Sequence, residues 1–230
     1  MNIKITENEI NLWIHVTNSG DVRLYHCSAT PFPQAPNELL NPAGGAATGS
    51  SSPAVKYRLV EVHESGMNQA DHHGSKHTGS SPGYLLRYRK HQDARTAFGR
   101  YLEIEQEYEG LIVRSHFQFF DSIPVIRTWT SLENQGTCTR PIEYISSFAV
   151  TGLTRGSGVQ RDISSTVHLP HNTWYGEAQW KRYSLEQLGY NVVNDFSVKR
   201  ISLSSIGTWS SSEYLPMGAF EHEQNGTTLA

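Results

Sequence analysis

Cysteine and long apolar runs are scarce in this sequence, and each scarcity excludes a class of protein. Only Cys27 and Cys138 occur among 230 residues, too few for a disulfide framework. No apolar run approaches the roughly 18 residues of a transmembrane helix. The N-terminus lacks a basic end followed by an apolar stretch, so no signal peptide is expected. The sequence therefore predicts a cytoplasmic protein without a membrane span.

Positive charge and nucleotide-binding motifs are also lacking. Lys and Arg number 19 against 22 Asp and Glu, a net charge of −3, whereas a nucleic-acid-binding protein needs a basic face. Gly156-Ser-Gly158 lacks the lysine and the helix of a phosphate-binding loop. No Gly-x-Ser-x-Gly elbow is present, which argues against a serine hydrolase. We therefore expect neither nucleic acid nor a cofactor as a partner.

Apolar residues alternate with polar ones at a period of two along most of the chain, the pattern of half-buried antiparallel strands. Asn18-Ser-Gly20 separates two such runs as a hairpin turn, and Glu109-Gly110 separates two more. The expected strands cover residues 10–17, 21–28, 57–63, 84–91, 100–108, 111–120, 123–132 and 142–151. This density of strands and turns predicts an all-β sandwich.

The domain organisation follows from length and from one low-complexity segment. A length of 230 residues suits one large all-β domain spanning 1–230. Residues 41–54 are rich in Gly, Ala, Ser and Pro, which predicts a flexible loop. About forty residues precede this loop, too few for a separate core.

The densest polar segment is the loop at 66–79, between two expected strands. It contains Asp71, His72, His73, Lys76 and His77. Imidazole and carboxylate groups suit zinc, but the adjacent His72 and His73 point opposite ways in an extended chain, and no thiolate is near. A sugar-contacting or interface loop and a solvated loop are the alternatives, and we predict no metal.

Carboxylates and aromatic residues form a second group of candidates. Glu103, Glu105 and Glu107 share one strand face and are expected to form a solvated edge. Glu213 and Glu221 lie near Trp209 and Tyr214 in the sequence. Aromatic rings beside carboxylates suit sugars, but these aromatic residues could equally fill the core.

Four motifs, taken together and in order, carry a family resemblance. They are Gly66-x-Asn-x-x-Asp-His-His-Gly-x-Lys76, Ser81-Pro-Gly-x-Leu-Leu-x-Tyr88-x-x-His91, Ser115-His-Phe-Gln-Phe-Phe-Asp-x-Ile-Pro-Val-Ile-Arg127 and Glu213-Tyr-Leu-Pro-Met-Gly218. The chain resembles the N-terminal domain of bacterial and fungal α-galactosidases of glycoside hydrolase family 36. The resemblance implies a mostly antiparallel β-supersandwich of galactose-mutarotase-like topology, which precedes a catalytic (β/α)₈ barrel.

The resemblance also implies different roles for the N-terminal domain and the barrel. In that family two aspartates on the barrel hydrolyse terminal α-galactosides with retention, so no catalytic residue is assigned here and the chain alone is expected to be inactive. The N-terminal domain packs against the barrel, and in tetrameric members one of its loops reaches a neighbouring subunit's active site. We therefore expect a homo-oligomer acting on α-galactoside oligosaccharides. The expected substrate-binding residues are Asp71, His72, His73, Lys76 and Trp209.

The last residues of the sequence suggest a β-hairpin that is interrupted in its second strand. Asn225-Gly226 predicts a two-residue hairpin turn, entered by a strand at 219–223 and followed only by residues 227–230. A hairpin needs both arms to satisfy its backbone groups. We therefore expect a domain that is incomplete at its C-terminus, with residues 219–223 at or near an open edge and a tendency to self-associate.

Two other functions stay open. A free-standing carbohydrate-binding module would use Trp13, Trp129, Trp174, Trp180 and Trp209, although these lie mostly within strand patterns, which favour the core. A sugar epimerase of mutarotase type would need a paired histidine and glutamate, and His116 with Glu103 or Glu105 could supply that pair.

Overall fold

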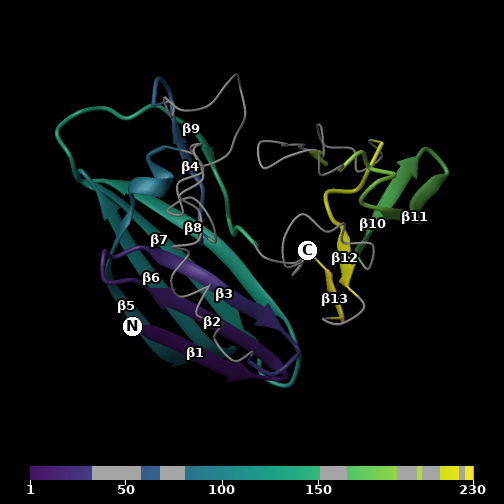
Figure 1. The fold of residues 1–230 in the computed structure, drawn as a ribbon, viewed down its shortest axis with the longest axis horizontal. Coiled ribbons are helices and arrows are strands. Elements are labelled where there is room, and N and C mark those ends of the chain that lie inside the picture. Colours follow the sequence, from purple (N-terminus) through teal and green to yellow (C-terminus); the bar gives the residue numbers. More distant parts are fainter. Residues whose placement is uncertain are drawn as a thin grey trace, which may run out of the picture. The chain divides into compact units, whose positions relative to one another are not determined.

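The computed structural model describes residues 1–32, 58–67, 81–150, 165–190, 201–203, 213–222 and 226–229. The chain divides into two compact units, unit 1 from Met1 to Gly152 and unit 2 from Leu153 to Ala230 (Figure 1). The single domain over 1–230 stays a prediction. The loop expected at 41–54 lies outside the described residues. None of the described segments is a helix long and apolar enough to cross a membrane.

The described strands of unit 1 form three antiparallel sheets. The first pairs β1 (Asn2–Glu7), β2 (Ile10–Val16) and β3 (Val22–Ser28) in that order. The second is a meander of β5 (Arg87–Thr96), β6 (Gly99–Tyr108), β7 (Leu111–Phe119) and β8 (Ile126–Asn134). The third pairs β4 (Val62–Glu64) with β9 (Ile142–Ile145), and η2 (Gly83–Leu85) is a short 3-10 turn before β5. The predicted all-β antiparallel fold is confirmed, and the mutarotase-like topology stays a prediction.

The first two sheets pack face to face across an apolar core. Alternation turns Leu12 and Ile14 of β2 inward, where they belong to the same buried cluster as Leu102 and Ile104 of β6 and Phe117 of β7. Each fully buried aliphatic or phenylalanine side chain contributes about 1.5–3 kcal/mol relative to an exposed one. Because side chains alternate along a strand, the neighbours of Leu102, Ile104 and Phe117 in β6 and β7 are directed to the outer face of the four-stranded sheet.

A buried ion cluster also ties the layers of unit 1 together. The Asp21 carboxylate lies 3.3 Å from Arg23, 3.2 Å from Arg58 and 3.1 Å from Arg87. Burial alone would raise the pKa of Asp21, but the three guanidinium groups outweigh it and lower that pKa. Burial lowers the pKa of Arg58 to about 10, against the opposing effect of Asp21. The cluster joins β3 to residue 58 and β5.

Unit 2 holds one antiparallel sheet in the order β11-β10-β12-β13. Its strands are β10 (Ser165–Thr173), β11 (Gly176–Ser184), β12 (Ala219–His222) and β13 (Gly226–Leu229). The hairpin expected near Asn225-Gly226 is present, but Gly226 pairs with His222 within the ladder. The two-residue turn predicted there is therefore wrong, and the connection lies on 223–225, outside the described residues. Among the described strands, β13 and β11 form the edges, and β12 lies inside.

Strand boundaries follow the prediction where alternation is unbroken and depart from it near breaks. The strands expected at 10–17, 21–28, 100–108 and 111–120 are confirmed, each within one residue at either end. The strand expected from 123 begins at Ile126, since Pro124 has no N–H to give to a ladder. The strand expected from 84 begins at Arg87 because η2 precedes it.

Candidate functional site

The substrate-binding residues predicted from the sequence lie outside the described part of the chain. Asp71, His72, His73, Lys76 and Trp209 all belong to undescribed segments, so their roles stay predictions. In the described part, no three His, Cys, Asp or Glu side chains gather into a metal-binding group.

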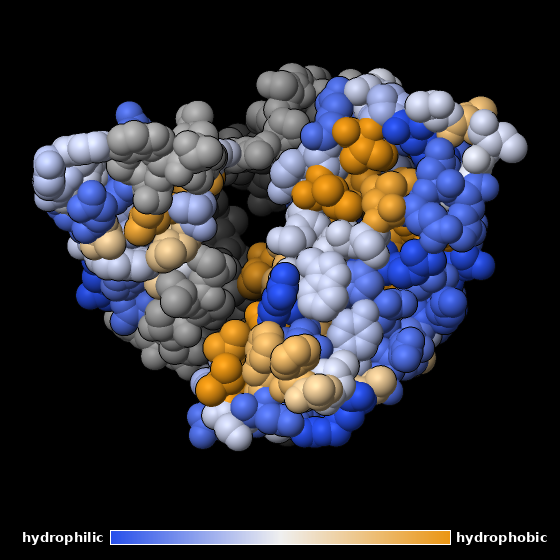
Figure 2. Space-filling model, turned by 180° about the vertical axis from the view of Figure 1, so that it is seen from behind, coloured by the Kyte–Doolittle hydropathy of each residue, from blue (hydrophilic) through white to orange (hydrophobic). Residues whose placement is uncertain are grey.

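A polar and aromatic cluster lies on the outer face of the four-stranded sheet. Register places Glu103 of β6 opposite His116 of β7, and His116 opposite Trp129 of β8. Tyr101 and Ser131 lie on the same face, two residues from Glu103 and Trp129. We call these five residues the sheet-face cluster. Figure 2 shows unit 1 from behind, where hydrophilic side chains cover much of the surface and hydrophobic patches lie beside them.

Hydrogen bonds link four members of the sheet-face cluster into one chain. The Tyr101 hydroxyl donates to the Glu103 carboxylate at 3.0 Å and also lies 2.6 Å from His116 Nδ1. Since the phenol proton is used by Glu103, His116 Nδ1–H donates to the Tyr101 oxygen. The Ser131 hydroxyl, 2.7 Å from His116 Nε2, then donates to that nitrogen. Both nitrogens of the buried imidazole are thereby satisfied.

Aromatic contacts hold Trp129, the fifth residue of the sheet-face cluster, in place. The rings of His116 and Trp129 are stacked, with centroids 4.8 Å apart and planes 11° apart. Tyr101 lies 6.1 Å from His116 and 6.1 Å from Trp129. His116 is only 7% exposed, whereas Tyr101 and Trp129 are half-buried. The histidine is therefore a buried support for two more accessible rings.

The protonation states of the cluster follow from its surroundings. Burial lowers the pKa of His116, and the nearby Arg114 adds to this, while Glu103 opposes it. Burial and the Glu103 carboxylate raise the pKa of Tyr101 to about 12. At neutral pH the cluster thus holds a neutral imidazole and a protonated phenol, as the hydrogen-bond chain requires.

The lowered pKa of His116 predicts a loss of stability in mild acid. A histidine whose folded pKa is depressed resists protonation in the native state, so stability present above its ordinary pKa of about 6.5 is lost as pH falls. His15 acts in the same direction because burial, the N-terminus and Arg23 lower its pKa. We expect the free energy of unfolding in urea to fall from pH 7.5 to pH 5.5. It should fall less in His116→Gln, and an equal fall in both proteins would contradict the assignment.

Glu105 departs from its predicted setting. It was expected on a solvated edge with Glu103 and Glu107, but it is 2% exposed. Its carboxylate lies 2.8 Å from Arg114 Nε, 3.4 Å from Arg89 Nη1 and 3.7 Å from Lys90 Nζ. The prediction was wrong for Glu105 because these long side chains cover the carboxylate.

The sheet-face cluster is poorly arranged for acid–base or nucleophilic catalysis. Glu103 lies 3.4 Å from His116 Nδ1, so the structure brings together one of the two His–Glu pairs that an epimerase could use. Glu105 instead pairs with Arg114. However, a general acid or base must reach a proton on the substrate, and His116 is buried with both nitrogens engaged by Tyr101 and Ser131. The arrangement is better suited to holding Trp129 and Tyr101 in place.

The tryptophans differ in exposure from what their strand positions indicated. Trp13 is 2% exposed and belongs to the interior, as expected. Trp174 and Trp180 are 60% and 46% exposed, and the neighbouring Tyr175 is 90% exposed. The expectation that most of the tryptophans belong to the core does not hold for these two, because Trp174 lies at the β10–β11 turn and Trp180 on the edge strand β11.

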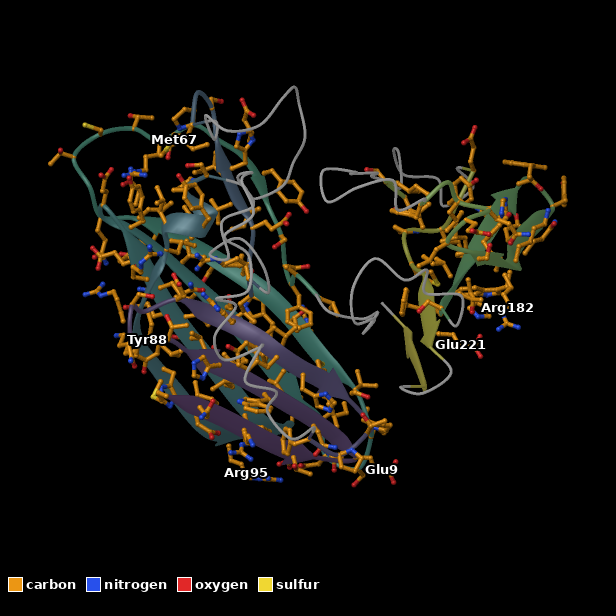
Figure 3. The ribbon with its side chains drawn as sticks, in the orientation of Figure 1. Glu9, Met67, Tyr88, Arg95, Arg182 and Glu221 are labelled. Carbon is orange, nitrogen blue, oxygen red and sulfur yellow. The ribbon has the colours of Figure 1, made fainter. Side chains whose placement is uncertain are left out.

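Unit 2 has a smaller polar group of its own. The Glu221 carboxylate of β12 accepts a hydrogen bond from His168 Nε2 of β10 at 2.8 Å. It also lies 3.6 Å from Arg182 Nη2 of β11. Figure 3 shows Arg182 and Glu221 close to each other in this unit. Hydrogen bonding from His168 lowers the pKa of Glu221. The contacts of Glu221 with His168 and Arg182 thus cross-link the three strands β10, β11 and β12. Tyr214 is not part of this group and contacts His171, with ring centroids 4.7 Å apart.

Comparison with known proteins finds similarity at the level of structure only. No family model matches the sequence, and no curated protein matches it. The fold is similar to the GH36 α-galactosidase AgaB of Geobacillus stearothermophilus, with a TM-score of 0.64 and 16% identity over 100% of this chain and 34% of that one. AgaA A355E of the same organism, in complex with 1-deoxygalactonojirimycin, has a TM-score of 0.65 and 15% identity, covering 97% and 32%. The α-galactosidase of Lactobacillus brevis has a TM-score of 0.62 and 13% identity, covering 97% and 31%.

These likenesses show that the chain has a fold found in GH36 α-galactosidases. The chain spans about a third of the length of those structures, while nearly all of it is matched. Variants of AgaA have been solved in complex with raffinose and with stachyose, again with about a third of the enzyme matched.

Proposed function

We propose that this chain is the non-catalytic N-terminal domain of an α-galactosidase of glycoside hydrolase family 36. The observation that carries the proposal is the asymmetry of the match, which covers 97–100% of this chain but only 31–34% of the enzymes named above. The order of the sequence motifs supports the same assignment. In this proposal the hydrolysis of terminal α-galactosides by two aspartates takes place on a separate barrel domain.

The domain would then act as a scaffold. Trp174 and Tyr175 are exposed, and exposed aromatic rings are suited to contacts with a further domain or subunit. We further propose that it packs against the barrel and contributes to a homo-oligomer, in the cytoplasm. The loop at 66–79 would enclose bound oligosaccharide.

The simplest test of a non-catalytic role uses the purified chain alone. We expect no release of nitrophenol from p-nitrophenyl α-galactoside above the buffer rate, and none of galactose from raffinose. Turnover that co-purifies with the chain and disappears in a variant of one of its own carboxylates would overturn the proposal.

The enclosing role of the loop at 66–79 predicts a difference between substrates. In an enzyme assembled from this chain and its catalytic domain, Asp71→Ala or His72→Ala should raise KM for raffinose several-fold. KM for the nitrophenyl galactoside should change much less, because that substrate is too short to reach the loop. Unchanged kinetics for both substrates would count against the role, and Ser65→Ala, just before the loop, is the matched control.

A mutarotase-like epimerase is the second candidate, favoured by the 3.4 Å approach of His116 to Glu103, while the engagement of both imidazole nitrogens counts against it. Polarimetry of freshly dissolved α-galactose would detect it as equilibration faster than in buffer. An enhanced rate that is lost in His116→Gln would support this function over the scaffold. Equal rates with and without the protein would remove it.

A further inference from the structure

The sheet-face cluster has features that a purely structural surface does not need. Tyr101 of β6 and Trp129 of β8 are aromatic side chains that remain half-buried on the outer face of the sheet. A buried histidine with two satisfied nitrogens supports them from beneath. We propose that the sheet-face cluster is a binding site for a galactose-containing saccharide.

Preorganisation is the first argument. A binding surface gains affinity when its side chains are already held in the bound geometry. Trp129 is stacked on His116, and Tyr101 is held by hydrogen bonds to Glu103 and His116. His116 is therefore a positioning residue that fixes the two rings before any ligand arrives.

The polar groups around the rings are the second argument. Arg127 is exposed, and its guanidinium carbon lies 5.6 Å from the centre of the Trp129 ring. The Glu103 side chain is 23% exposed. A guanidinium offers several donors and a carboxylate offers acceptors, so sugar hydroxyls could be bound from both sides of the ring system. The long Arg127 side chain can move from the indole to a hydroxyl as a sugar ring replaces it.

The ligand class follows from this combination. Sugars present C–H groups to aromatic rings and hydroxyls to charged side chains. Opposite charges at the ring, from Arg127 and Glu103, do not favour a polyanion. Galactose has an axial hydroxyl that leaves a continuous C–H patch on its other face, which suits an indole. The choice of galactose among sugars rests on the proposed function, whereas the saccharide site itself rests on the cluster.

The test follows the backbone amide and indole N–H signals of the chain by NMR while methyl α-galactoside is added, so that binding can also be measured in a variant without the Trp129 indole. We expect saturable movement of the Trp129 signal with a dissociation constant of about 1–10 mM, as for a small contact area. Trp129→Ala should lower the affinity for methyl α-galactoside at least tenfold, and Arg127→Ala should lower it a few-fold. Trp174→Ala is the matched control, an exposed tryptophan in the other unit, and should bind normally.

Three outcomes decide against part or all of the proposal. Binding that is unchanged in Trp129→Ala would overturn the site. A sedimentation change in Trp129→Ala without any sugar-induced shift would show a contact between copies of this chain, which also overturns it. Methyl α-glucoside binding as tightly as the galactoside would keep the saccharide site and overturn the choice of galactose. None of these depends on whether the chain assembles with a catalytic domain.

Discussion

Replacing Asp21 with alanine is expected to destabilise unit 1 by about 3–5 kcal/mol, the range found when one partner of a buried ion pair is removed. The Asp21 side chain is 7% exposed, and those of Arg23 and Arg58 are 7% and 6% exposed. Without the carboxylate, two buried guanidinium groups and the half-exposed Arg87 would face one another unpaired. Urea unfolding at pH 7 measures the loss.

The control for this prediction is Asp93→Ala. Asp93 also pairs with an arginine, Arg100, at 2.6 Å, but the two side chains are 35% and 28% exposed. Because solvent screens such pairs, their removal costs about 1 kcal/mol or less. Similar losses in both variants would show that Asp21 does not hold the layers together.

A second large loss of stability is expected for Gly99→Ala. Gly99 begins β6 with a φ of +142°, and a Cβ added there would lie 2.4 Å from the Phe119 carbonyl oxygen and 3.0 Å from the Asp121 nitrogen. Both atoms are backbone, so relief requires the β5–β6 and β7–β8 connections to move apart. We expect a loss of about 3 kcal/mol or more, and a reduced melting temperature.

Gly66→Ala separates backbone strain from this collision. Gly66 has a φ of +82°, but among the described residues an added Cβ would meet no atom within 4 Å. Only the left-handed conformation is then penalised, by about 1–2 kcal/mol. If Gly99→Ala is no worse than Gly66→Ala, the close approach to Phe119 is not important for the fold.

Much of unit 1 could be predicted because its signals are local. Alternation along β6 and β7 identified strands of the right length, and the turn at Glu109-Gly110 joined them. The burial of Glu105 could not be predicted from the alternation of apolar and polar residues. Its burial depends on Arg114 from the next strand and on Arg89 and Lys90 beside a bulge in β5, and no local pattern reveals that three cations converge on one carboxylate.

The sheet-face cluster was foreseen only in part. His116 with Glu103 was one of two pairings left open, and register selected it by placing these residues opposite each other. Tyr101 of β6, and Trp129 and Ser131 of β8, were not connected with His116, since that residue lies on a third strand, β7. Counting back from the turns at 109–110 and 135–136 would have aligned them. The exposure of Trp174 and Trp180 depends on which strand forms the sheet edge, which periodicity does not tell.

The central claim is that this chain completes a galactosidase whose catalytic groups lie on another domain. The most direct measurement is α-galactosidase activity after co-expression of this chain with AgaA from which the matching third is deleted. We predict a co-purifying complex that hydrolyses nitrophenyl α-galactoside, whereas the deleted enzyme alone does not. If AgaA's own missing third restores activity and this chain neither binds nor restores it, the claim is contradicted.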